Sequence, residues 1–450
     1  MKHHITRLTP VILLAILLVS ARNAASQTSG PISLQQAIEY GLANNSSYKK
    51  TELDIQRNEY RYSEVRSGYL PQITGSVQFM DNLQLQTSIL PGELAGGEPG
   101  STIPVQFGTK FNVNAVIDAN QAIYDQSQIY NMRLARQNGA ISELSLAKSK
   151  EQLTYDIANT YYAAQISLTQ KKLVTDNLVK LDSLVKITTI QFNNGFATKL
   201  DVDKLRVSQT NQQTQQATAE SNYQQQLLML KYLMGLPLDA PVEVVAIDMS
   251  ANPTSGIVNP ESLNMTEINL ATAQKEIYET NLSQVKAGYL PSLTANFRFM
   301  YMFQQNDLRV FDKNANWFPS SYVGLTLNVP IFDGLTKYNK AKQVKLQIDQ
   351  TDLDIKYLTE SLKMQRSNAQ TKLSTNLASL ESQQRNIELA QEVFQTTEVQ
   401  YKGGIANMTD LVNSETSLKE AQANYLQALV QVKIAELDLL RATGNINTIK

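Results

Sequence analysis

A thirteen-residue segment occurs twice in this chain, and the repeat limits the folds that the chain can adopt. Residues 68–80 are identical at seven positions to residues 288–300, which lie 220 positions further on. Two shorter motifs recur in the same order at offsets of 208 and 209 residues: Ile123-Tyr124-Asp125 with Ile331-Phe332-Asp333, and Phe192-Asn193-Asn194-Gly195 with Tyr401-Lys402-Gly403-Gly404. The period is much longer than the roughly 20–50 residues of solenoid repeats, so the pattern indicates two copies of a whole structural unit.

The chain begins with a segment that has the composition of a secretory signal peptide. Lys2 and Arg7 are followed by an apolar run from Val11 to Val19 and then by small residues. A later segment with four prolines and little helical pattern indicates a connector. The predicted organisation is therefore a signal peptide over residues 1–26, a first repeat over 27–235, a linker over 236–262 and a second repeat over 263–450.

The composition excludes most catalytic chemistry. The chain has no cysteine, and its two histidines, His3 and His4, lie inside the predicted signal peptide. The mature chain thus has no thiolate nucleophile, no imidazole base and no thiolate or imidazole metal ligand. Lys and Arg number 40 against 41 Asp and Glu, without a basic block for nucleic acid. We predict a protein that is not an enzyme, with no catalytic residues, no cofactor, no metal site and no nucleic-acid partner.

Four segments alternate between apolar and polar residues with a period of two. They begin near Ile73, Phe111, Leu293 and Val323. Strands of about ten residues with this alternation are typical of a transmembrane β-barrel, although half-buried strands of a soluble sandwich alternate as well. Because about eight strands are needed to close a barrel, four strands require a barrel shared between copies of the chain. Aromatic residues near the strand ends resemble a membrane girdle: Tyr69, Tyr289, Phe311, Trp317, Phe318 and Tyr322.

Long helices account for most of the remaining sequence. From Ser127 to about Gln191 there is no proline and one glycine, which predicts a helix of roughly 97 Å at 1.5 Å per residue. Within it Val174, Leu178, Leu181 and Val185 have coiled-coil spacing. Residues 31–66 and 199–234 predict two further helices, the first capped by Ser33 with Gln36 at the capping-box position. After the signal peptide no apolar run is long enough for a transmembrane helix.

In order and spacing, these features resemble those of the TolC-family outer-membrane efflux proteins over essentially the whole mature chain. The motifs that carry the resemblance are Ser33-Leu34-Gln35-Gln36-Ala37-Ile38 with Asn44-Asn45, both Gly-Tyr-Leu-Pro copies, Val329-Pro330-Ile331-Phe332-Asp333-Gly334, and the paired Asn-Gly and Gly-Gly turns. The resemblance implies a mixed fold: a long α-helical coiled-coil barrel in the periplasm and a transmembrane β-barrel to which each chain of a homotrimer contributes four strands. It also implies a passive exit duct of a tripartite efflux or type I secretion system, set in outer-membrane lipid and driven by an inner-membrane transporter through a periplasmic adaptor.

The resemblance assigns the adaptor contact to two tight turns between helices. Gly195 and Gly404 can adopt φ > 0, which such turns require. The predicted adaptor-contacting tips are Asn194, Gly195 and Phe196 in the first repeat and Gly403, Gly404 and Ile405 in the second. Plain αα-hairpin turns without a partner are the alternative.

The resemblance also assigns a periplasmic entrance near those turns. Asp410 matches an aspartate that rings the entrance in the family, where three symmetry-related carboxylates would attract cations. Asp201 is its equivalent in the first repeat, and Tyr401 matches an aromatic residue of the closed tip. Asn413 replaces the family's second aspartate and Ala406 replaces its locking arginine, so the family's gating is not transferred. The alternative for Asp201 and Asp410 is a helix N-cap.

Two other classes of protein fit parts of the sequence. A periplasmic coiled-coil adaptor, or a structural protein without a membrane barrel, would have long helical hairpins, but an adaptor also needs lipoyl-like and β-barrel domains with many short strands. An exported carboxylate hydrolase needs two acids that converge in a pocket. The acids of this chain are scattered along its helices.

Overall fold

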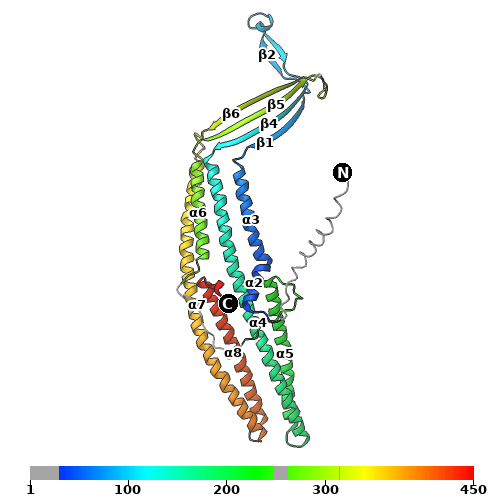
Figure 1. Ribbon diagram of the computed structural model, residues 1–450, viewed down its shortest axis with the longest axis vertical. Helices are drawn as coiled ribbons and strands as arrows, with labels where there is room; N and C mark the ends of the chain where they lie inside the picture. The colour runs from blue at the N-terminus through cyan, green and yellow to red at the C-terminus, as the bar shows by residue number, and fades with distance from the viewer. Residues whose placement is uncertain (1–29, 248–261, 314, 450) are drawn as a thin grey trace, which may run out of the picture. The chain divides into compact units, whose positions relative to one another are not determined.

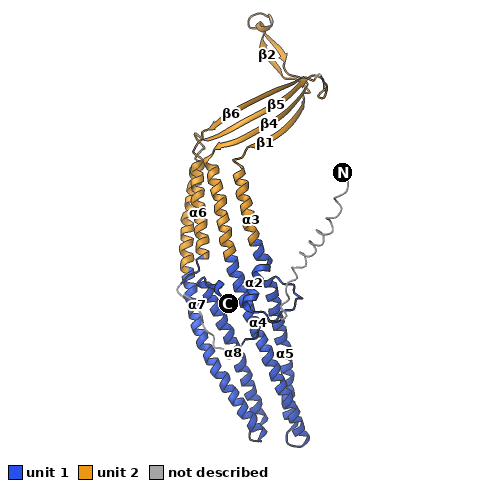
Figure 2. Cartoon of the chain, in the orientation of Figure 1, with its two compact units in different colours: residues 1–50, 148–265, 361–450 blue, residues 51–147, 266–360 orange. Residues whose placement is uncertain are grey.

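The computed structural model describes residues 30–247, 262–313 and 315–449. The predicted signal peptide lies outside the described residues, as does most of the predicted linker. The chain divides into two compact units, shown in Figure 2. The first comprises residues 1–50, 148–265 and 361–450, and the second comprises residues 51–147 and 266–360.

The helices and strands follow one another in the order shown in Figure 1. They are α2 (Leu34–Asn44), α3 (Ser46–Ser67), β1 (Gln72–Asp81), β2 (Thr87–Pro91), η2 (Gly92–Ala95), β3 (Thr102–Gln106), β4 (Phe111–Tyr124), α4 (Gln126–Asn193), α5 (Lys199–Met234), α6 (Thr266–Ala287), β5 (Ser292–Gln305), β6 (Trp317–Asn328), α7 (Thr336–Lys402), α8 (Met408–Ala442) and η3 (Ile446–Thr448).

The second unit contains an antiparallel sheet with the strand order β1-β4-β5-β6. These are the four strands that the alternating pattern predicts, and that prediction is confirmed. The central pair joins β4 of the first predicted repeat to β5 of the second. One row across the sheet runs from Thr74 to Asp118, Arg298 and Tyr322. In this row the Arg298 Nε donates to the Asp118 Oδ1 at 2.5 Å.

One face of the sheet is apolar and exposed. Ile73, Val77, Val323 and Leu325 all lie on it with most of their surface exposed. Strands β1 and β6 are the two edges, so each leaves one row of backbone N–H and C=O groups unpaired in the sheet. This chain alone therefore covers neither the apolar face nor the edges.

The prediction of only four strands is wrong, because a separate two-stranded hairpin, β2–β3, lies between β1 and β4. Each of its strands has five residues and includes a proline, Pro91 or Pro104. Proline removes a backbone donor and short strands give little alternation, so sequence pattern favours a loop there. Figure 1 shows the hairpin projecting from the end of the sheet.

The predicted helix over residues 31–66 is also wrong as a single element, because it is broken at Asn45. The buried Asn45 Oδ1 accepts the N–H groups of Ser47 and Tyr48 and so caps α3, while its Nδ2 donates to the Leu233 carbonyl at 2.8 Å. The cap of α2 is the predicted one, a capping box of Ser33 and Gln36. The predictions of a helix over residues 199–234 and of a long helix from Ser127 are confirmed. The first is α5, which spans the 36 residues expected, and the second is α4, which extends over 68 residues.

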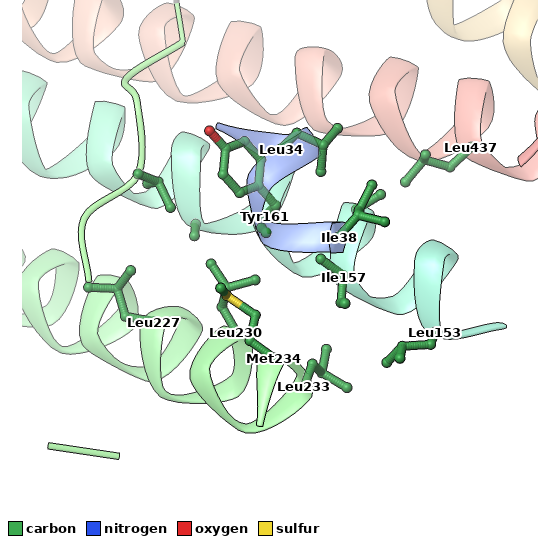
Figure 3. Close-up of a cluster of buried hydrophobic side chains, with 14 of the residues drawn as sticks. Leu34, Ile38, Leu153, Ile157, Tyr161, Leu227, Leu230, Leu233, Met234 and Leu437 are labelled. Carbon is green, nitrogen blue, oxygen red and sulfur yellow. The ribbon is translucent and has the colours of Figure 1, made fainter. Parts of the chain in front are cut away.

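The core of the first unit gathers α2, α4, α5 and α8 around one apolar cluster (Figure 3). Ile157 of α4 and Leu230 of α5 are fully buried, and Ile38 of α2 packs with them. Each such side chain contributes about 1.5–3 kcal/mol through burial. The described part of the linker joins this cluster, because Val244 is buried and the Ile32 N–H donates to the Glu243 carbonyl at 2.9 Å.

Among the helices that the structure describes, none combines the length and apolar character needed to cross a membrane.

Candidate functional site

The first predicted tip is the turn between α4 and α5. Gly195 has φ 81°, which an L-residue adopts only at a cost. The Phe196 N–H donates to the Gln191 carbonyl at 2.8 Å and the Gly195 N–H to the Phe192 carbonyl at 3.0 Å. This pair of bonds is a Schellman motif, which satisfies carbonyls at the end of α4. The Asn194 Nδ2 donates to the Ile190 carbonyl at 2.9 Å and holds the same turn.

The second predicted tip, between α7 and α8, has the same construction. Gly404 has φ 73°. The Ile405 N–H donates to the Gln400 carbonyl at 2.8 Å, and the Gly404 N–H to the Tyr401 carbonyl at 3.0 Å. The preceding residue, Gly403, does not have a positive φ. The predicted left-handed glycines are confirmed in both turns.

Each turn presents one apolar side chain to solvent. In a Schellman motif the residue after the glycine usually packs against the third residue from the helix end, which here is a glutamine in both turns. Phe196 and Ile405 follow these glycines and are 85% and 82% exposed. An exposed phenyl ring and an exposed branched aliphatic chain therefore mark the two turns.

The predicted entrance acids Asp201 and Asp410 hold equivalent places in helix caps. Asp201 is the third residue of α5, and its carboxylate accepts the Thr198 N–H at 3.0 Å. Asp410 is the third residue of α8, and its carboxylate accepts the Asn407 N–H at 3.3 Å. The N-caps are thus Thr198 and Asn407, so the N-cap alternative for the two acids is wrong in position although both acids do belong to caps. Thr-x-x-Asp and Asn-x-x-Asp are readable capping patterns that the sequence interpretation missed.

A contact between α5 and α8 joins the two helical hairpins near their turns. The Lys204 Nζ donates to the Thr409 Oγ1 at 3.0 Å. Next to this contact lies a buried apolar cluster in which Leu205, Met408 and Leu411 are almost completely covered. The turns therefore rest on packed helices rather than on free loops.

The remaining predicted residues lie close to the same cluster. Tyr401 is half-buried and packs against it. Asn413 is exposed on α8, three residues after Asp410, which places both on one side of the helix. Ala406 is half-buried in the turn itself. The sequence therefore identified residues that gather at one end of the first unit.

A polar groove runs between α4, α5 and α8 above this end, with a volume of about 560 Å³. Amide and hydroxyl side chains form most of its wall. The Asn177 Nδ2 donates to the Gln422 Oε1 at 3.0 Å across it, and the buried Gln212 donates to the Val174 carbonyl. Beside it Lys171 forms an ion pair with Glu220 at 2.7 Å. The hydrogen bond from Lys171 lowers the pKa of Glu220 below the ordinary 4.5.

Nothing in the described ranges gathers three or more His, Cys, Asp or Glu side chains for a metal ion. The site is thus composed of two turns, two helix caps, an inter-hairpin hydrogen bond and a groove lined mostly by amide and hydroxyl side chains, with Lys419 and Glu420 among them. Such groups can bind and orient protein or solute.

Comparison with known proteins gives one consistent result. The profile of the outer membrane efflux proteins matches residues 37–236 and 259–445. The chain is 22% identical to the outer membrane efflux protein BepC of Brucella suis over 99% of this chain and 92% of that protein. It is 18% identical to the outer membrane protein TolC of Escherichia coli over 97% and 87% of the two chains.

Solved structures share the fold. The outer membrane protein VceC of Vibrio cholerae superposes with a TM-score of 0.70 at 15% identity, over 91% of this chain and 96% of that one. The outer-membrane channel OprN superposes with a TM-score of 0.71 at 14% identity, over 92% and 90%. Since the family profile covers both halves of the sequence, the chain belongs to the outer membrane efflux protein family.

Proposed function

We propose that this outer-membrane protein is a passive exit duct and that it works as a homotrimer. Twelve strands, four from each chain, form one transmembrane β-barrel in contact with lipid, and the helices form a coiled-coil tunnel in the periplasm. An inner-membrane transporter drives export through a periplasmic adaptor, as in a tripartite efflux or type I secretion system. The duct itself catalyses no reaction.

The observation that carries this proposal is that the four-stranded sheet is open and does not close into a barrel within one chain. Its strands β1 and β6 are both free edges, and the exposed face bears Ile73, Val77, Val323 and Leu325. Four strands are too few to close a barrel. Pairing of β6 with β1 of another copy supplies the missing backbone partners and directs the apolar face to lipid.

The internal duplication is part of the same proposal. Glycines with positive φ at 195 and 404, and capping-box acids at 201 and 410, recur at an offset of 209 residues. Two helical hairpins of one construction in each chain give a trimer six similar hairpins. We infer that this quasi-equivalence lets a threefold assembly present a regular ring to its partners.

The two turns are the adaptor-binding tips in this proposal, with Asn194, Gly195, Phe196, Gly403, Gly404 and Ile405 as contact residues. The exposure of Phe196 and Ile405 supports the assignment, because an exposed apolar side chain on a rigid turn gains free energy when a partner covers it. Asp410 faces the entrance together with Asn413, Tyr401 and the equivalent Asp201. The family relationship favours this duct over the adaptor alternative.

Electron microscopy of the full-length protein, extracted in detergent from outer-membrane fractions, tests the proposal. The expected result is a threefold particle with a barrel at one end, whose mass is three times that of the mature chain. Particles of a single chain, or protein found only in the soluble periplasmic fraction, would refute the duct.

A further inference from the structure

Two segments with exposed apolar side chains leave the four-stranded sheet at the same end, one near each free edge. Asp81 at the end of β1 pairs with Phe111 at the start of β4, and Phe111 pairs with Gln305 at the end of β5. The β2–β3 hairpin therefore departs from the sheet where the segment between β5 and β6 also departs. The hairpin directly follows edge strand β1, and the other segment directly precedes edge strand β6.

The stem of the hairpin is uncharged and exposes large apolar side chains. The Asn82 N–H donates to the Lys110 carbonyl at 2.7 Å and closes the stem. Next to this bond Leu83 is 89% exposed, and Phe107 on the opposite side of the stem is 55% exposed. Neither residues 82–92 nor residues 101–109 include a charge. Because an isolated two-stranded hairpin is only marginally stable in water, this stem needs another surface to pack against.

The segment before β6 holds an aromatic ring fully in solvent. Phe311 has no part of its side chain covered, and Leu308 beside it is 56% exposed. The backbone around Phe311 is nevertheless folded, since the Asp312 N–H donates to the Arg309 carbonyl at 3.2 Å and the Trp317 Nε1 donates to the Val310 carbonyl at 3.3 Å. The ring is therefore held on an ordered turn.

We propose that Phe311 of one copy packs against Leu83 and Phe107 of the next copy. The proposal rests on the proposed trimer, in which β6 of one chain pairs with β1 of its neighbour. That pairing brings the segment before β6 beside the hairpin stem that follows β1. Each presents exposed apolar side chains, and in the segment before β6 these stand among the charged residues Asp307, Arg309, Asp312 and Lys313. Three equivalent contacts then fasten the β2–β3 hairpins around the mouth of the barrel.

The lipid surface is the competing partner for Phe311. Aromatic residues at membrane interfaces are mostly Trp and Tyr, whose polar group reaches the headgroups while the ring meets the lipid. Phe311 and Leu308 have no polar group, and neither do Leu83 and Phe107. Four wholly apolar side chains at two adjoining edges match each other better than they match a headgroup layer.

Disulfide trapping in this cysteine-free chain tests the contact. Two differently tagged chains are co-expressed, one with Phe311→Cys and one with Leu83→Cys, and the purified trimer is oxidised mildly. We expect a disulfide between the two tags. The matched control is Leu94→Cys in place of Leu83→Cys, because Leu94 is similarly exposed, at 77%, but lies in η2 at the opposite end of the hairpin from Leu83 and Phe107. Its yield of disulfide should be at least tenfold lower.

The outcomes separate this inference from the proposed function. An intact trimer without the Phe311–Leu83 disulfide overturns the inference and leaves the duct standing, as does equal trapping at Leu94. Labelling of the cysteine at position 311 by a reagent dissolved in the lipid assigns the ring to the membrane and also overturns the inference. Absence of a trimer overturns both. In a second measurement, Phe311→Ser should lower the temperature at which the trimer dissociates, whereas an unchanged temperature contradicts the contact.

Discussion

The ammonium group of Lys204 lies 3.0 Å from the hydroxyl oxygen of Thr409, and this hydrogen bond links the N-terminal ends of α5 and α8. Lys204→Met and Thr409→Val should each lower stability slightly. The double variant should be destabilised by about as much as one single variant, rather than by the sum of the two effects. A double-mutant cycle on thermal unfolding should give a coupling of about 0.5–1 kcal/mol, small because the pair is exposed. Additive effects would show that the two side chains do not interact.

Asp410→Asn should reduce selectivity for cations in planar-bilayer recordings several-fold and weaken block by multivalent cations, because a ring of carboxylates loses its charge. Asp201→Asn makes the same change at the equivalent capping-box position of the first repeat and loses the same helix-dipole interaction, so the two variants together show which of the two entrance acids sets the selectivity. Equal currents for the two variants and the wild type would remove Asp410 from the entrance.

Gly404→Ala should lower stability by about 1 kcal/mol or more, because alanine is strained at φ 73°. Gly403→Ala is the control in the same turn: its added methyl group meets no atom closer than 3.5 Å, and the change should stay within about 0.5 kcal/mol. The comparison is read from thermal unfolding of the two variants. If both alanines are tolerated equally, the left-handed conformation of Gly404 is not needed for the turn.

The ionisation of Tyr155 should make the stability of the protein fall at alkaline pH. Burial, together with its hydrogen bond to Asp438 at 2.8 Å, raises the pKa of Tyr155 from 10.0 to about 12. The unfolded tyrosine ionises first as pH rises, so its stabilising contribution is complete below pH 10 and is lost between about pH 10 and pH 12. Denaturation between pH 9 and pH 11 should therefore show a steeper loss of stability for the wild type than for Tyr155→Phe.

Local pattern was sufficient for much of this fold. Alternation predicted β1, β4, β5 and β6, and coiled-coil spacing together with the lack of proline predicted α4. Each signal is the regular spacing of apolar side chains on one face of a strand or helix, so it can be read from that single segment of sequence. The two turns were predictable for a related reason, since Gly195 and Gly404 are needed by the backbone itself.

The features that sequence did not predict depend on distant partners. Asn45 breaks the first helix because its amide reaches the Leu233 carbonyl, 188 residues away. Lys204 and Thr409 were overlooked for the same reason, since their contact depends on the packing of two hairpins. Strands β2 and β3 are short and contain prolines, so only their pairing with each other reveals them. The roles assigned to Asp410 and to the tip residues are predictions, and the bilayer recordings test the role of Asp410.

The pairing of β4 with β5 has a consequence for how the protein is made. Asp118 and Arg298 are neighbours in the sheet but 180 residues apart in the chain. Contacts between residues so far apart in the sequence form late, because a long loop must close first. While the second half is still being exported, β1 and β4 are no more than a two-stranded hairpin with an exposed apolar face, a structure prone to aggregate. The first half of the chain is therefore the part that most needs a chaperone on its way to the outer membrane.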